Sequence, residues 1–131
     1  MDRDLLDIWQ TINKDCFGGR LRVVTDIDWH QLSGEDNLDA FGIYIPQVGS
    51  IAIDERFKFD KARCAARDEV ELAKVEVAYR IVMHEMIHQA LHQKEVDGFG
   101  GHGTEFVDEA APIAAKLGGR SANGRRRASL A

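Results

Sequence analysis

The chain has 131 residues, of which 44% are hydrophobic and 30% are charged, and this predicts one globular domain of ordinary composition. No run approaches the roughly 20 apolar residues that span a bilayer, the acidic start is unlike a secretory signal, and the net charge of −5 argues against a body wrapped in nucleic acid. Cys16 and Cys64 form no C-x-x-C pair, which argues against a disulfide framework or a zinc ribbon and favours a reducing cytoplasm.

The beginning of the chain predicts a helix followed by a strand. Apolar residues between positions 4 and 16 recur at the spacing of one helical face, and Gly18 and Gly19 end the pattern. Residues 20–29 then alternate between apolar and polar. This alternation predicts a half-buried strand whose inner face carries Leu21, Val23, Thr25, Ile27 and Trp29.

Two further short strands are predicted at residues 40–45 and 50–53, because apolar side chains alternate there. Residues 46–49 lie between them and would turn one strand into the other, which gives a small hairpin. With the strand at 20–29, this predicts a three-stranded antiparallel sheet. The polar residues after Asp54 are expected to link the sheet to the main helix.

The strongest predicted element is a helix over residues 69–93. Asp68 is expected to cap its start, and Glu71, three residues later, to complete a capping box. Apolar residues cover several sides of this helix, from Leu72 to Leu91. A helix that is apolar on so many sides is expected to run through the middle of the domain.

The end of the chain predicts a loop, a last helix and a basic tail. Residues 97–103 are rich in glycine, and Thr104 can cap the helix that follows them. Pro112 should kink or divide this helix, and the glycines at 118 and 119 should end it. We therefore expect a domain over residues 1–118 and a disordered tail over 119–131, whose four arginines could bind DNA phosphates.

The sequence His84-Glu85-Met86-Ile87-His88 lies in the middle of the main helix and points to metal chemistry. Residues four apart lie one turn apart on one helical face, so His84 and His88 can reach the same ion. Zinc favours such nitrogen ligands, and a catalytic zinc takes three protein ligands. Glu85 is rotated about 100° from His84, where it can accept a proton from water that the metal acidifies. The sequence thus predicts one zinc ion per chain, with Glu85 as the catalytic base.

The third ligand is less directly indicated. The metzincin spacing would require Gly at 91 and His at 94, where this chain has Leu91 and Lys94. His92 is one turn beyond His88, but three ligands on one straight helix would span about 12 Å, so His92 is interpreted as a surface residue. His102 and Glu109 remain, and the glycines on both sides of His102 favour it.

Several other residues are candidates for supporting roles. Tyr44 and Tyr79 could stabilise an oxyanion, although Tyr79 lies about 140° from His84 around the helix. Glu105 or Asp108 could hydrogen-bond a ligand histidine. The larger aromatic side chains are interpreted as core residues, namely Trp9, Trp29, Phe41 and Phe106.

Residues 5–117 resemble the SprT-like metallopeptidase domain. The most specific matches are the H-E-x-x-H of residues 84–88 and the H-G-x-x-F of residues 102–106, and weaker ones include Trp29 and the segment 51–53. The resemblance implies a three-histidine zinc site of His84, His88 and His102, with Glu85 catalytic. It also implies substrates that are proteins bound to DNA. The chain departs from many relatives, because it lacks a cysteine-rich zinc ribbon and is acidic.

These expectations combine into one hypothesis. The fold is α+β and zincin-like, with an N-terminal helix, a three-stranded sheet, a long H-E-x-x-H helix and a C-terminal helix. The function is zinc-dependent hydrolysis of peptide bonds in a protein or peptide substrate, which includes DNA-associated proteins if the tail binds DNA. The alternative is a non-proteolytic, zinc-stabilised module that binds protein or DNA.

Overall fold

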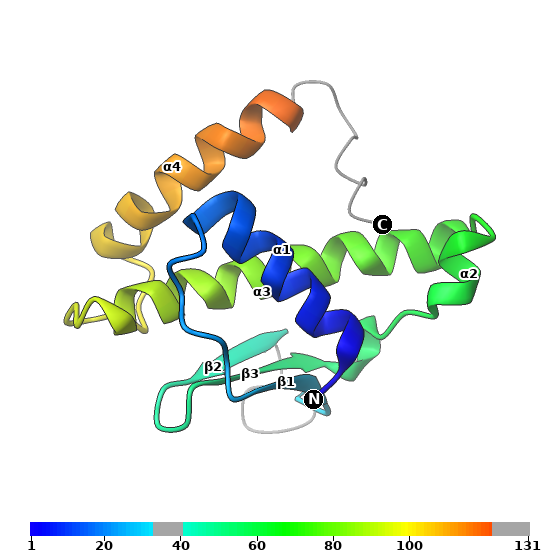
Figure 1. Cartoon of the computed structure of the whole chain (residues 1–131), viewed down its shortest axis with the longest axis horizontal. Coiled ribbons are helices and arrows are strands. Elements are labelled where there is room, and N and C mark those ends of the chain that lie inside the picture. The colour runs from blue at the N-terminus through cyan, green and yellow to red at the C-terminus, as the bar shows by residue number, and fades with distance from the viewer. Residues whose placement is uncertain (33–40, 122–131) are drawn as a thin grey trace.

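A computed structural model describes residues 1–32 and 41–121 of the chain (Figure 1). The long helix α3 runs across the molecule, α1 crosses it, the sheet lies below it and α4 lies above one of its ends. The elements in chain order are α1 (Arg3–Phe17), β1 (Asp26–His30), β2 (Gly42–Ile45), β3 (Ser50–Asp54), the short 3-10 helix η1 (Glu55–Phe57), α2 (Lys61–Ala65), α3 (Glu69–Gln93) and α4 (Thr104–Ser121). The predicted α+β class is confirmed.

The sheet is mixed rather than antiparallel, with the strand order β1-β3-β2. The predicted hairpin is present, since β2 pairs with β3 in antiparallel fashion and sets Tyr44 opposite Ile51. β1 pairs with the other edge of β3 in parallel, with Ile27 opposite Ile51. The prediction of an antiparallel sheet was wrong because alternation reveals which face of a strand is buried but carries no information about its direction.

Residues 20–25, predicted as the start of the first strand, are irregular in the structure. The amide side chain of Asn13 holds this segment, accepting from the backbone N–H of Leu21 at 3.1 Å and donating to its carbonyl at 3.2 Å. The alternation consequently breaks there: Val24 is buried, whereas Val23 is 63% exposed. Side-chain hydrogen bonds thus replace the strand pairing that the apolar pattern predicted.

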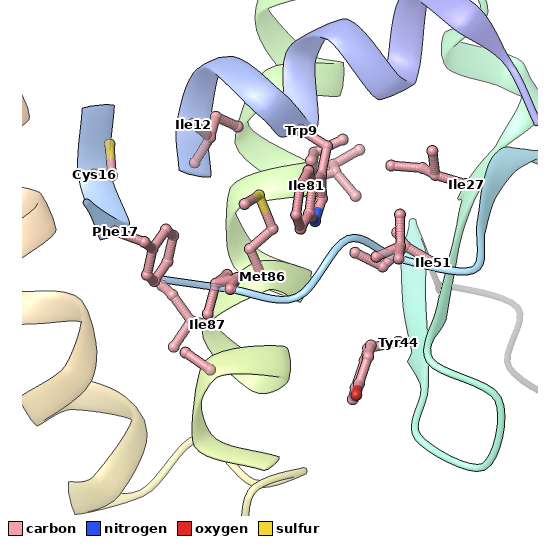
Figure 2. Packing of buried hydrophobic residues seen from close by; sticks show 14 of the residues in the cluster. Trp9, Ile12, Cys16, Phe17, Ile27, Tyr44, Ile51, Ile81, Met86 and Ile87 are labelled. Atoms are coloured by element: carbon pink, nitrogen blue, oxygen red, sulfur yellow. The ribbon is translucent and has the colours of Figure 1, made fainter. Parts of the chain in front are cut away.

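The core lies between α1, α3 and the sheet (Figure 2). Trp9 is buried as predicted, and its indole N–H donates to the side chain of Gln89 at 3.1 Å. The amide of Gln89 donates in turn to the carbonyl of Arg22 at 2.8 Å. This buried bridge fixes α1 and the irregular segment against α3, the helix that carries His84 and His88.

The predicted helix over residues 69–93 is confirmed as α3, and buried side chains line it along most of its length. Asp68 caps it as predicted, because its carboxylate accepts from the N–H groups of Val70 and Glu71 at 3.0 and 3.2 Å. The capping box is not formed. Glu71 instead accepts from the N–H of Asp60 at 2.7 Å, and so ties the segment before α2 to α3.

Other local details differ in part from what was expected. The residues after Asp54 link the sheet to α3 as predicted, and this link contains η1 and α2. Pro112 was expected to kink or divide the last helix, and α4 is continuous through it, so the helix is not divided there. α4 also extends past the predicted end at residues 118 and 119 to Ser121. Phe41, expected in the core, is 49% exposed. Most of the predicted tail, residues 122–131, lies outside the described residues.

No helix in the described ranges combines the length and the apolar character that crossing a membrane requires.

Candidate metal centre

Three histidines from two separate segments come together at the surface of α3. His84 and His88 lie one helical turn apart on α3, as their spacing predicted. His102 lies in the glycine-rich segment that joins α3 to α4. Its Nε2 atom is 3.0 Å from Nε2 of His84 and 3.2 Å from Nε2 of His88. The three are therefore close enough to bind one metal ion.

The spacing of the three nitrogen atoms fits a tetrahedral metal site. Ligand nitrogens on one zinc ion, each about 2.0–2.1 Å from the metal at tetrahedral angles, lie roughly 3.3 Å apart. The two measured N–N distances of 3.0 and 3.2 Å are slightly shorter than this. A small outward movement of the His102 ring would therefore bring these two distances to the value expected around an ion.

The orientation of His88 is set by a backbone carbonyl. Nδ1 of His88 donates to the carbonyl oxygen of Phe99 at 2.6 Å, which leaves the lone pair on Nε2 for the metal. Burial lowers the pKa of His88; the hydrogen bond to Phe99 acts in the opposite direction, and the neighbouring His102 adds to the lowering. A neutral imidazole is the form that binds metal, so the environment favours binding at neutral pH.

His84 is also held in its neutral form. Burial, together with the positive charges that His88 and His102 can carry, lowers its pKa to about 4. Exposure across the group is uneven: His88 is buried, His84 is half-buried and His102 is exposed. The centre is therefore open to solvent, and to a ligand, on the side of His102.

Phe106, expected in the core, packs against all three imidazoles. Its ring centroid is 4.9 Å from those of His84 and His88 and 5.0 Å from that of His102. Phe106 lies in the first turn of α4, as the third residue of that helix. This contact gives a structural reason for the phenylalanine of the H-G-x-x-F motif, which is not a metal ligand.

Glu85 lies beside the histidines on α3 and is 7% exposed. Burial raises the pKa of its carboxyl group to about 7, although a hydrogen bond from the backbone N–H of Tyr44 acts in the opposite direction. A carboxyl group with a pKa near neutrality is suited to exchange protons at physiological pH. Glu85 thus lies on the same part of α3 as His84 and His88.

The other candidate residues have different roles. Glu109 forms an ion pair with Lys94 at 2.6 Å and is not part of the three-histidine group. Glu105 and Asp108, considered as hydrogen-bond partners of a ligand histidine, are exposed, and the partner of His88 Nδ1 is the Phe99 carbonyl. Tyr79 is buried.

His92 was interpreted as a surface residue, and the structure corrects this. Its ring is partly buried, and its Nδ1 is hydrogen-bonded to the hydroxyl group of Tyr44 at 2.7 Å. That hydroxyl was a candidate for stabilising an oxyanion, but it is directed to His92. The backbone contacts to Glu85 and His88 were also missed, since main-chain atoms leave no signal in a sequence.

Comparison with protein-family models, with curated proteins and with solved structures gave no match to this chain.

Proposed function

We propose that this chain is a zinc-dependent endopeptidase domain that hydrolyses peptide bonds in proteins or peptides. The observation that carries the proposal is the convergence of three imidazole Nε2 atoms, at 3.0 and 3.2 Å, on the helix that also carries a buried carboxyl group. Three neutral nitrogen ligands are the donor set of many catalytic zinc sites. The H-E-x-x-H spacing supports the same assignment, with His84 and His88 as metal ligands and Glu85 as the base.

The residues divide the chemistry among them. When bound, zinc would supply a Lewis acid that polarises a peptide carbonyl and lowers the pKa of water. His84, His88 and His102 would hold the metal, and Phe99 and Phe106 contact the histidine group on two sides. Glu85 accepts a proton from the attacking water and passes it to the leaving amine. The N–H of Tyr44 holds the Glu85 carboxylate in place for this transfer.

The number of ligands favours an enzyme over the alternative of a zinc-stabilised binding module. Structural zinc sites are closed by four protein ligands, whereas catalytic sites keep one position for water or substrate. In the part of the chain that the structure describes, the group contains three possible ligands. The exposure of His102 supports the same conclusion, because water or a substrate can reach the histidine group from that side.

The experiment that tests this proposal is the substitution Glu85→Gln in the full chain. We expect the variant to retain about one zinc per chain while hydrolysis of a denatured protein falls by about 10²–10⁴-fold. Zinc is measured by elemental analysis and hydrolysis by the release of peptides. Glu76→Gln makes the same chemical change on α3, away from the histidines, and should hydrolyse like the wild type.

Two results would overturn the proposal. One is a Glu85→Gln protein that digests the substrate at the wild-type rate. The other is a zinc-loaded wild type with four protein ligands, which would support the binding module instead.

The resemblance to SprT-like domains supports the same activity and extends it to proteins bound to DNA. The motifs that carry the resemblance, residues 84–88 and 102–106, form the histidine group and its Phe106 support. The DNA-related part of the proposal depends on that resemblance and on the four arginines of the tail, of which those at 125–127 lie outside the described residues.

A further inference from the structure

His92 connects β2 to the segment that carries His102. Its Nδ1 is bonded to the Tyr44 hydroxyl at 2.7 Å, and its ring centroid is 4.7 Å from that of Phe99. It is not a member of the three-histidine group. A histidine with a partly buried hydrogen bond on one side and an aromatic contact on the other is restrained in its orientation, unlike a fully solvated surface residue.

Phe99 links this contact to the metal ligands. Its side chain packs on His92, while its carbonyl accepts from Nδ1 of His88 at 2.6 Å. Three residues later the chain reaches His102. The backbone between α3 and Phe99 is irregular, with Glu95 and Gly98 both at positive φ, so the segment's position depends strongly on such side-chain contacts.

Tyr44 connects the same contact to Glu85. Its hydroxyl is bonded to His92, and its backbone N–H donates to the Glu85 carboxylate. Figure 2 shows Tyr44 at the edge of the core cluster, on the hairpin side. One residue of β2 therefore touches both the proposed base and the residue that holds the loop.

We propose that His92, together with Tyr44, is a positioning residue of the metal centre. By holding Phe99, His92 orients His88 through the Phe99 carbonyl and places His102 beside the two helix histidines. This inference rests on the proposed function, because it assigns the three histidines to a metal. It goes beyond that function because it assigns a role to His92, the third histidine of α3, as a support of the ligands and not as a ligand itself.

Zinc affinity of the full-length chain, measured by competition with a chelator of known affinity, tests the inference without relying on hydrolysis. Loss of a residue that supports a metal ligand typically weakens metal binding about 10–100-fold, and we expect this for His92→Ala. His92→Phe keeps a ring against Phe99, and Tyr44→Phe keeps the backbone N–H, so each should weaken binding less than His92→Ala. His92 is not a ligand, so the metal should have the same coordination in all three variants as in the wild type. Their Co²⁺-loaded forms should therefore have the same visible spectrum as the Co²⁺-loaded wild type.

Val75→Ala is the matched control, since Val75 is a buried α3 residue that lies more than three helical turns before His88. It should destabilise the fold but leave zinc affinity unchanged under conditions in which the protein is folded. Unchanged affinity in His92→Ala would overturn the inference. So would an equal loss of affinity in Val75→Ala, because His92 would then act only through global stability.

A metal-free measurement separates this inference from the proposed function. In the wild type, the Nδ1 proton of His88 should give a resolved NMR signal, because its hydrogen bond to the Phe99 carbonyl slows exchange. We expect that signal to disappear in His92→Ala and to remain in Val75→Ala. Its persistence in His92→Ala overturns the positioning role. A wild type that binds no zinc overturns the proposed metal centre, whichever way the proton signal behaves.

Discussion

The close approach of β2 to α3 predicts that Gly42→Ala will damage both stability and activity. A Cβ atom at residue 42 would lie 2.5 Å from Cγ2 of Ile81 and 3.3 Å from the carbonyl oxygen of Ala52. Ordinary carbon–carbon contact requires about 3.5 Å, so β2 would have to move away from α3 by roughly 1 Å. Cγ2 of Ile81 is attached directly to Cβ and cannot swing aside as the end of a long side chain can.

The size of the effect follows from this displacement. Forcing an extra methyl group into a packed site typically costs about 1–3 kcal/mol, and we expect Gly42→Ala to lower the free energy of unfolding by that amount. Tyr44, two residues along β2, donates its N–H to Glu85. A hydrogen bond of ordinary length, about 2.9 Å, does not survive a lengthening of about 1 Å, so hydrolysis should fall as well.

The assays are urea unfolding with a chelator present and hydrolysis of a denatured protein with zinc present. Gly100→Ala is the matched control, because a Cβ there meets no atom within 4 Å. Adding Ile81→Ala to Gly42→Ala removes the clashing atom, so the double variant should be more stable than the sum of the single effects predicts, by about 1 kcal/mol or more. A Gly42→Ala protein that unfolds and hydrolyses like the wild type would show that β2 does not pack on α3 in this way.

Two further predictions concern α3. Gln89→Met keeps the side-chain volume but leaves the buried Trp9 indole N–H without its acceptor, which should lower the free energy of unfolding by about 1–3 kcal/mol. The double variant with Trp9→Phe should lose less stability than the sum of the two single effects. Strict additivity of the two effects would contradict the Trp9–Gln89 hydrogen bond. Because the pKa of His84 falls from 6.5 to about 4 on folding, mainly through burial, the unfolded chain binds the extra proton. The metal-free protein should therefore lose stability as the pH falls from about 6.5 to 4, and urea midpoints should show a flatter pH dependence in His84→Gln. An equal slope in both proteins would refute this assignment.

The sequence alone was enough to find the elements whose signals are local. The helix around His84 and His88 was predicted with its cap at Asp68, because helix caps and the 3.6-residue period are properties of neighbouring residues. The pair His84 and His88 followed from the same period. His102 was favoured as the third ligand because the glycines on both sides of it let the loop bring its imidazole back to the helix, and the structure places it beside His84 and His88.

The tertiary structure decided everything that depends on partners distant along the chain. The parallel pairing of β1 with β3, the irregular segment that Asn13 holds, and the exposure of Phe41 all depend on such partners. The orientation of the histidine side chains also depends on distant partners. The Phe99 carbonyl that orients His88 and the Tyr44 N–H that holds Glu85 are main-chain groups, which every residue has. Only folding determines which of these groups reaches which side chain, and for that reason the sequence named the residues of the centre but not the contacts that orient them.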